Sequence, residues 1–403
     1  MNDTASISNL NNQLSSTGEQ LAITILMPCL NEAETLGACI EKAQHSLKQS
    51  RLSGEVLVAD NGSTDGSVAI ALRSGARVVH VEERGYGSAL RNGIDAARGK
   101  WIVMGDADDS YDFANIDAFV EKLGQGFELV MGCRMPSGGG KIMGGAMPWK
   151  HRWLGNPVLS WIGRLFFRCP VHDFHCGLRA LSKDAYNQMD LRTTGMEFAS
   201  EMVIKAALKQ MKVSEVPITL HKDGRSRPPH LRSWRDGWRH LRFMLLFSPT
   251  WLFLIPGLLL LLLGTVVGLR LAAGPIYVGR IGFDTNTLLL CAMSVILGVQ
   301  ICLFAIFTRV FAMTVGLLPV SDRATTLFRL LTLERGLLLS LLVLLVGILL
   351  LFEAMLYWKQ AEFGPISYPA SLRKVVPAVT TISLGVQGVF SSFFLSILGL
   401  SRR

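Results

Sequence analysis

The sequence predicts an α/β domain in residues 21–232, followed by an all-α membrane region of about four helices in residues 251–403. Two observations lead to this fold class. Short apolar segments alternate with helical patterns in residues 22–132, whereas long uncharged segments dominate from residue 251 onward. The composition agrees, since 50% of the 403 residues are hydrophobic and only 18% are charged, against roughly 25% in a typical soluble chain. A disordered chain and a purely soluble enzyme are therefore disfavoured.

The α/β domain is expected to begin after a polar tail. Residues 1–20 are rich in Ser, Asn, Gln and Thr, so we expect a disordered tail and no signal peptide. The apolar segments that predict strands are residues 22–27, 55–59, 77–81, 101–105 and 128–132, and the clearest helical patterns between them end near residue 48 and cover 86–97. Apolar strands that alternate with helices indicate a parallel sheet covered on both faces.

Polar side chains follow the first, second and fourth of these strands. They form the clusters Pro28–Glu32 (PCLNE), Asp60–Gly66 (DNGSTDG) and Asp106–Asp109 (DADD). Ligands of such sheets bind beyond the carboxyl ends of the strands, so these clusters are expected to form one binding site. No G-x-G-x-x-G follows the first strand, and G-x-x-x-x-G-K-[ST] does not occur. The charge of a bound nucleotide therefore needs another partner.

The acidic cluster after the fourth strand is the expected partner. Asp106 and Asp108 flank a small alanine, so both carboxylates can turn toward one ion at the end of the strand. Hard oxygen ligands suit Mg²⁺ or Mn²⁺, and Mg²⁺ binds through one or two carboxylates together with substrate phosphates. The alternative is a solvated acidic turn in which Asp109 caps a helix. Asp60 and Asp65, at the end of an earlier strand, favour the metal site.

These three clusters, in this order and spacing, resemble the signatures of family 2 glycosyltransferases with the GT-A fold. The resemblance covers about residues 20–250, and the nearest branch is that of the polyprenyl-phosphate (dolichol-phosphate-type) mannosyl- and glucosyltransferases. It implies a GT-A, Rossmann-like domain that binds a UDP- or GDP-linked nucleotide-sugar with a divalent metal ion. It also implies the inverting transfer of a hexose to polyprenyl (undecaprenyl or dolichyl) phosphate, which gives a polyprenyl-phosphate sugar.

The same resemblance implies roles for individual residues. Those expected to contact the nucleotide-sugar are Pro28, Asn31, Glu32, Asp60, Ser63, Asp65, Asp106 and Ala107. Asp106 and Asp108 are implied as the catalytic residues and metal ligands. Arg134 matches the family arginine that meets the acceptor phosphate. An ionised phosphate needs positive groups rather than a strong general base, so Arg179 and Arg227 are further candidates for this role.

Two segments depart from the family pattern. Asp109–Asp112 (DSYD) stands where a glutamine often follows the metal-binding carboxylates, which leaves part of the metal sphere unassigned. Gly224–Arg227 (GRSR) replaces the usual Gly-x-Ser-Lys of the acceptor loop, which keeps the charge but changes its geometry. His175 is expected to be a core residue. Glu197 and Glu201 share one face of a predicted helix, where one of them reaches the donor sugar or both are exposed acids.

Four long segments with few charges predict membrane spans at about residues 251–269, 285–308, 336–356 and 375–400, because a hydrocarbon core of about 30 Å needs about 20 apolar residues. Lys and Arg gather on the cytoplasmic side of spans. Arginines are concentrated before the first span, between the second and third, and at the C-terminus. This pattern predicts a multi-pass plasma-membrane protein with both termini and the α/β domain in the cytoplasm.

The net charge of +9 is also explained by the membrane. A basic domain can indicate nucleic acid, but here the excess lies next to the predicted spans, where anionic lipid headgroups are the better partner. Residues 149–167 and 233–250 mix Trp, Leu and Phe with Lys and Arg, which predicts interfacial helices; helices buried in the core are the alternative. No nucleic-acid partner is therefore expected, whereas a homo-oligomer is left open.

Two other functions are alternatives. Processive polysaccharide synthases also join this type of domain to spans, but they carry Gln-x-x-Arg-Trp, and the Arg152-Trp153 pair here has Trp149 at the glutamine position. A non-catalytic membrane scaffold or transporter of lipid-linked sugars is disfavoured by the intact acidic clusters. No acidic residue lies in the middle of a predicted span to mark a transport pathway, since Glu353 is near a span end.

Overall fold

The structure is a computed structural model and describes residues 21–226, 233–315, 318 and 332–400. The predicted tail, residues 1–20, lies outside the described residues. Contacts between residues divide the chain into two compact units, Met1–Met244 and Leu245–Arg403. This division falls inside helix α9 (Ser233–Leu246), so the domain boundaries at residues 232 and 250 stay predictions.

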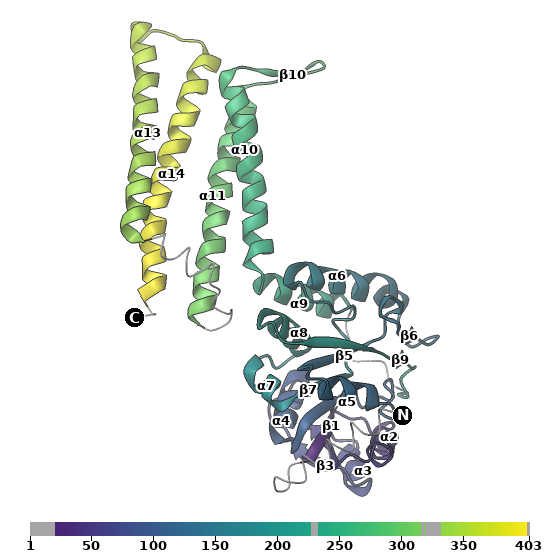
Figure 1. The fold of residues 1–403 in the computed structure, drawn as a ribbon. Coiled ribbons are helices and arrows are strands. Elements are labelled where there is room, and N and C mark those ends of the chain that lie inside the picture. Colours follow the sequence, from purple (N-terminus) through teal and green to yellow (C-terminus); the bar gives the residue numbers. More distant parts are fainter. Residues whose placement is uncertain (1–20, 227–232, 316–317, 319–331, 401–403) are drawn as a thin grey trace. The chain divides into compact units, whose positions relative to one another are not determined.

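The first unit is built on a sheet that has seven strands within the described residues, in the order β3-β2-β1-β4-β7-β5-β8 (Figure 1). The strands are β1 (Leu21–Cys29), β2 (Gly54–Asp60), β3 (Arg77–His80), β4 (Gly99–Met104), β5 (Leu129–Cys133), β7 (Arg179–Ser182) and β8 (Val213–Pro217). All five predicted strands are present, and the α/β fold class is confirmed. A small separate sheet pairs β6 (Lys141–Ile142) with β9 (Thr219–Leu220).

The predicted parallel sheet holds except at β7, a strand that the sequence did not predict. This strand lies between β4 and β5 and runs antiparallel to both. The chain leaves β5 at the carboxyl edge of the sheet, and residues 134–178 do not carry it back to the opposite edge, because Met131 near the end of β5 pairs with Arg179 at the start of β7. A strand that enters from this edge has to run in the reverse direction.

Helices cover both faces of the sheet. They are α2 (Leu36–Gln49), α3 (Ser67–Arg73), α4 (Tyr86–Ala96), α5 (Asp117–Gly124), α7 (Lys183–Met189) and α8 (Phe198–Leu208). Successive side chains of β1 point to opposite faces. Ile23 and Ile25 belong to the apolar cluster that includes residues of α2 and α5, whereas Leu26 faces α4. There Gly93 allows a close approach, since a Cβ would lie 2.5 Å from the Leu26 side chain.

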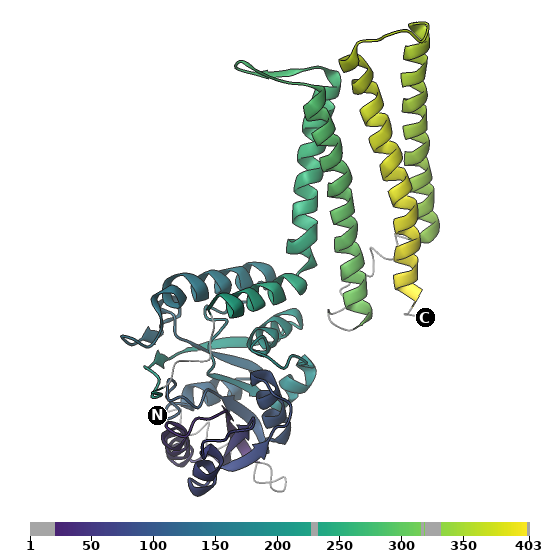
Figure 2. The ribbon, with the colours of Figure 1, turned by 180° about the vertical axis from the view of Figure 1, so that it is seen from behind.

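Helices α6 (Asn156–Phe167) and α9 lie next to each other, as Figure 2 shows from behind. Helix α6 buries two small residues, Ser160 and Gly163. A Cβ at Gly163 would lie 2.8 Å from the Phe174 ring, and Ser160 Oγ accepts a 3.2 Å hydrogen bond from Phe174 N–H. The large residues Trp161 and Leu165 are exposed instead. Helix α6 is therefore not a core helix, and its interfacial role stays a prediction.

The second unit contains four helices, among its described residues, that are long and apolar enough to cross a membrane. They are Thr250–Ala273, which includes α10 (Ile255–Ala273), α11 (Thr285–Thr314), α13 (Leu333–Gln360) and α14 (Tyr368–Leu400). Each contains one predicted span. Glycines bring neighbouring helices close, as is typical of membrane bundles: a Cβ at Gly298 would lie 2.6 Å from Leu261 N, and one at Gly347 would lie 2.6 Å from Ile382 N.

Candidate active site

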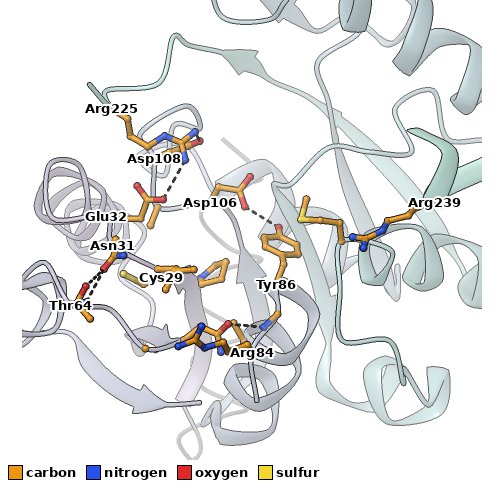
Figure 3. A pocket seen from close by; sticks show the side chains of 18 of the residues that line it. Cys29, Asn31, Glu32, Thr64, Arg84, Tyr86, Asp106, Asp108, Arg225 and Arg239 are labelled. Atoms are coloured by element: carbon orange, nitrogen blue, oxygen red, sulfur yellow. Dashed lines mark hydrogen bonds and ion pairs between the residues drawn. The ribbon is translucent and has the colours of Figure 1, made fainter. Parts of the chain in front are cut away.

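A cavity of about 760 Å³ lies where β1, β2 and β4 end (Figure 3). It is lined by Pro28–Glu32, Asn61, Gly62, Thr64, Arg84–Tyr86, Ala89, Asp106–Asp108, Met196, Arg225, Arg235 and Arg239. The three polar clusters recognised in the sequence therefore meet at one place. They do so because the carboxyl ends of parallel neighbouring strands share one edge of the sheet.

Asp106 is held between helix α4 and a glycine. The Tyr86 hydroxyl donates a 2.9 Å hydrogen bond to Asp106 Oδ1, and Figure 3 shows the two side chains pointing toward each other. On the other side, a Cβ at Gly177 would lie 2.6 Å from Asp106 Oδ2. Burial, and then the negative charge of Asp108, raise the pKa of Asp106 to about 6. The Asp106 carboxylate therefore has a fixed position, and its ionised form is disfavoured there. A nearby cation would stabilise the ionised form.

Asp108 already lies beside a cation. The Arg225 guanidinium contacts Asp108 Oδ2 at 2.8 Å and Glu32 Oε1 at 3.3 Å, and it also pairs with Asp223 at 3.0 Å. The other carboxylate oxygen of Asp108 accepts a 2.6 Å hydrogen bond from Ser110 Oγ. Because the Arg225 side chain is only 12% exposed, water screens these pairs weakly. The carboxylates of the cavity therefore hold a positive group in this structure.

The segment that carries Arg225 is anchored by a hydrogen bond on each side of this residue. The Gly224 N–H donates a 3.0 Å hydrogen bond to the Asp108 carbonyl oxygen. The Ser226 N–H donates a 2.7 Å hydrogen bond to the Glu34 carboxylate. Gly224–Ser226 is the part of the Gly-Arg-Ser-Arg segment that agrees with the family pattern, and it places Arg225 beside the carboxylates. The departure, Arg227 in place of lysine, lies outside the described residues.

Asn31 connects the loops that follow β1 and β2. It adopts a left-handed conformation (φ 59°), which asparagine tolerates better than most residues. Its N–H donates to Ser63 Oγ at 2.9 Å, and its Oδ1 accepts from Thr64 N–H at 2.7 Å. Asp60 accepts from Ser63 N–H at 3.2 Å, and Asp65 accepts from the chain that follows β1 at 2.9 Å. Of the predicted donor-binding residues, Pro28, Asn31, Glu32, Asp106 and Ala107 line the cavity, whereas Asp60, Ser63 and Asp65 support the loops beside it.

The structure does not place the predicted acceptor arginines on the cavity. Arg134 pairs with the fully buried Asp173 through two contacts of 2.7 and 2.8 Å. Arg179 is completely buried and donates to three backbone carbonyl oxygens, those of Cys176, Phe174 and Ala199. Both guanidinium groups hold the chain between β5 and α8 in this structure, and their assignment to the acceptor phosphate stays a prediction. Arg227, the third candidate, lies outside the described residues.

Neither acidic residue in the DSYD segment lines the cavity in this structure. Asp109 pairs with Lys42 at 2.6 Å. Asp112 accepts a 3.0 Å hydrogen bond from Ala114 N–H and so closes its own turn. The two side chains therefore stabilise local structure, and the described cavity lining contains neither of them.

Two of the other residues of open role, His175 and Glu201, are packed within the fold. Burial lowers the pKa of His175 well below its ordinary value, and its ring packs on that of His240 at 4.6 Å. Glu201 pairs with the buried Lys205 at 2.8 Å and accepts from Thr193 N–H at 2.9 Å. Glu201 is therefore not an exposed helix acid, and neither it nor Glu197 is among the residues that line the cavity.

Several residues that line the cavity were not named as site residues from the sequence, among them Tyr86, Arg235 and Arg239. The spacing of the last two on helix α9 is a signal that they share a face, but in the sequence they serve equally well as membrane-flanking charges. The role of Tyr86 depends on its contact with Asp106 across 20 residues, which no local pattern reveals.

The donor set fits a hard divalent ion. No group of three or more His, Cys, Asp or Glu side chains that could hold a metal occurs among the residues the structure describes. Asp106 and Asp108 offer carboxylate oxygens, so the remaining ligands would come from substrate phosphates and water. That is the usual coordination of Mg²⁺, and the cation that Asp108 already holds shows that the site favours positive charge.

Comparison with known proteins identifies the family. The models of "Glycosyl transferase family 2" and "Glycosyltransferase family 2 C-terminal transmembrane region" match residues 24–189 and 306–399. The low-salt glycan biosynthesis hexosyltransferase Agl6 of Haloferax volcanii is 38% identical over 379 residues, which are 94% of this chain and 89% of that protein. The dolichyl-phosphate hexose transferase of the same organism is 27% identical over 197 residues, which are 49% of this chain and 81% of that protein.

Among solved structures, glucosyl-3-phosphoglycerate synthase from Mycobacterium tuberculosis, in complex with Mn²⁺, UDP and glucosyl-3-phosphoglycerate, is similar over 60% of this chain and 81% of that chain, with 23% identity and a TM-score of 0.44. The sequence match to the Haloferax hexosyltransferase extends over nearly the whole length of both proteins. The chain therefore belongs to glycosyltransferase family 2 and is a membrane-bound glycosyltransferase with an α/β domain of the GT-A type.

Proposed function

We propose that this glycosyltransferase transfers a hexose from a UDP- or GDP-linked donor to polyprenyl phosphate, on the cytoplasmic face of the plasma membrane. The observation that carries the proposal is the composition of the cavity, in which the loops after β1 and β2 meet two carboxylates after β4 and arginines from separate segments. The names of two relatives support it, because one is a hexosyltransferase and the other a dolichyl-phosphate hexose transferase.

The donor half of the cavity suits a nucleotide-sugar. Asn31 and Asn61 line the cavity where the first two strands end, and Asp106 and Asp108 would hold Mg²⁺ or Mn²⁺. When bound, the ion stabilises the negative charge that develops on the departing diphosphate. Because Arg225 now contacts Asp108 at 2.8 Å, it has to withdraw or share that carboxylate when the ion binds. Its guanidinium is then available to the diphosphate.

The reaction depends on the orientation of the two substrates and on neutralisation of their negative charges more than on proton transfer. An oxygen of the ionised acceptor phosphate attacks the anomeric carbon, the bond from this carbon to the diphosphate breaks, and its electron pair leaves with the nucleoside diphosphate. Attack opposite the leaving group inverts the anomeric configuration. No proton has to be removed from the acceptor, so the task of the protein is to bring two anions together.

The outer surface of the same unit suits a lipid acceptor. Exposed tryptophans lie on or beside both helices. Trp161 is on α6 and Trp153 shortly precedes it, whereas Trp234 and Trp238 are on α9. Tryptophan is enriched where membranes meet water, because its ring is apolar and its N–H is polar. This exposure supports the proposal that both helices lie in the headgroup region, which would bring a lipid phosphate to the catalytic domain.

A donor panel tests the proposal. Membranes that contain the full-length protein are incubated with labelled UDP- and GDP-sugars, polyprenyl phosphate and Mg²⁺ or Mn²⁺. We expect one donor to give an acid-labile product that extracts into organic solvent. Asp108→Asn should reduce it by at least about 100-fold, whereas the control Asp112→Asn, which removes a carboxylate from the turn beside the cavity, should retain activity.

Two results would contradict the proposal. If no donor gives a lipid-extractable product, the acceptor is wrong. A long polymer in place of a lipid-linked monosaccharide would identify a processive synthase instead.

A further inference from the structure

Two arginines of helix α9 line the same cavity as the catalytic carboxylates. Arg235 and Arg239 are four residues apart, so their side chains leave the helix on one face. Figure 3 shows Arg239 directed from α9 toward Tyr86 and Asp106. Both belong to the first compact unit, as do all the other residues that line the cavity.

The rotation of α9 is set by its buried face. His240 is buried, and its Nδ1 lies 2.8 Å from Ser200 Oγ of helix α8. Met244, one turn further, is completely buried. At 3.6 residues per turn these two lie on the side of the helix opposite to Arg235 and Arg239. The packing of α9 therefore sets the direction in which the Arg235 and Arg239 side chains leave the helix.

A third face of α9 is apolar and exposed. Trp234 is 86% exposed and Trp238 is 57% exposed. Each tryptophan directly precedes one of the two arginines, so along the helix the paired indoles and guanidinium groups lie at the same levels. In sequence, α9 leads into the first helix that is long and apolar enough to span a membrane, Thr250–Ala273.

The positive charges of Arg235 and Arg239 suit the binding of a phosphate at this end of the cavity. An anionic acceptor that approaches Asp106 and Asp108 is repelled by both, and a pair of guanidinium groups offsets this repulsion while it forms bidentate hydrogen bonds. Ser226 and Glu34 anchor Arg225 on the opposite, donor side, beside Asp108. The two ends of the cavity therefore offer separate cations for two separate anions.

We propose that Arg235 and Arg239 form the binding site for the phosphate of the lipid acceptor, with Trp234 and Trp238 at the depth of the headgroups. This inference deepens the proposed function and rests on it. Arg134 and Arg179, the candidates for this role from the sequence, do not line this cavity. The ligand is a phosphate monoester on a hydrocarbon chain. The donor diphosphate is the other source of the same chemistry, and the experiment separates the two.

The first arm of the experiment is kinetic and uses the full-length protein in nanodiscs. Arg235→Gln and Arg239→Gln should each raise the KM for polyprenyl phosphate about 10-fold, and the double variant about 100-fold, since a hydrogen bond to a charged group contributes about 1.5–3 kcal/mol. The KM for the nucleotide-sugar should change by less than about threefold. Arg239→Lys should restore part of the loss, and the control Arg242→Gln, which changes an exposed arginine of α9 outside the cavity lining, should behave as wild type.

The second arm measures binding without turnover. Titration with farnesyl phosphate, inorganic phosphate and nucleoside diphosphate plus Mn²⁺ compares wild type with the double variant. We expect the double variant to lose binding of farnesyl phosphate and to keep binding of the nucleoside diphosphate. In the wild type, we expect inorganic phosphate to bind much more weakly than farnesyl phosphate. If wild type binds farnesyl phosphate through these arginines but makes no lipid product, the proposed function fails and the site stands.

Other results overturn the inference. If a variant raises the KM for the nucleotide-sugar or binds the nucleoside diphosphate more weakly, the arginines belong to the donor site. Unchanged kinetics and unchanged farnesyl phosphate binding in the double variant show that the acceptor phosphate binds elsewhere.

Discussion

Gly177→Ala is expected to disable the site through one added methyl group. Gly177 follows Cys176 in the segment between β5 and β7, and its φ is not in the left-handed region, so alanine suits the backbone. The new Cβ would lie 2.6 Å from Asp106 Oδ2 and 3.0 Å from the Tyr111 ring. Ordinary contacts begin at 3.4 Å, so the carboxylate has to move by about 0.8 Å.

The size of the effect follows from what prevents this movement. Asp106 is held on its other side by the Tyr86 hydroxyl at 2.9 Å. Overpacking of this kind costs about 1–3 kcal/mol of stability, so we expect a fall of a few degrees in the unfolding temperature. A displacement approaching 1 Å at a reacting centre lowers the rate about 100-fold, which corresponds to about 2.7 kcal/mol in the barrier.

The assay is kcat/KM for sugar transfer, together with thermal unfolding of the same samples. Gly144→Ala is the matched control, since a Cβ there meets nothing within 4 Å, and it should keep both values. If Gly177→Ala retains wild-type kcat/KM, the carboxylate of Asp106 does not need its observed position, and our account of the metal site is refuted.

Three further predictions concern charge. Burial and Asp108 raise the pKa of Asp106 to about 6, above its ordinary 3.8, so the folded state favours the protonated carboxyl and this stabilisation is lost as the pH rises through about 6. Asp106→Asn should therefore raise the unfolding temperature of the metal-free protein more at pH 8 than at pH 5; an equal effect at both would contradict the assignment. Arg134→Gln leaves the buried Asp173 without its ion pair, so it should destabilise the protein by about 3–5 kcal/mol in thermal unfolding, and Arg134→Gln with Asp173→Asn should be milder; an unaltered unfolding temperature in the single variant would favour a role outside the fold. Arg225→Gln removes the cation beside Asp108, so titration with Mn²⁺ in the absence of nucleotide should show about fivefold tighter binding, equivalent to about 1 kcal/mol for one ion pair; weaker binding would mean that Arg225 assists the metal.

The strands and the acidic clusters were predictable because their signals are local. Each apolar segment identified its own strand, and each polar cluster followed directly at the carboxyl end, where the topology of such sheets gathers them. The reverse direction of β7 was not predictable, since Arg179–Ser182 is short and its direction depends on where residues 134–178 return to the sheet.

Charged side chains were the least predictable part of the site. Arg134 directly follows β5, and Arg179 begins β7. The arginine side chain is long, however, and its guanidinium group can pair with an acceptor that is remote in sequence. Asp173 lies 39 residues from Arg134, and Ala199 lies 20 residues from Arg179. Arg235 and Arg239 had an adequate explanation as membrane-flanking charges, and nothing local showed that α9 turns them toward the cavity.

The sequence by itself determined the class of the molecule: an α/β catalytic domain, apolar helices of membrane length, and carboxylates at the ends of strands. These features depend on the periodicity and composition of neighbouring residues, which act over a few ångströms along the chain. Only the tertiary structure decided which arginines are buried in ion pairs and which line the cavity. That choice depends on distances between residues remote in sequence, and the free energy of a charge changes greatly between a buried carboxylate partner and an open, wet cavity.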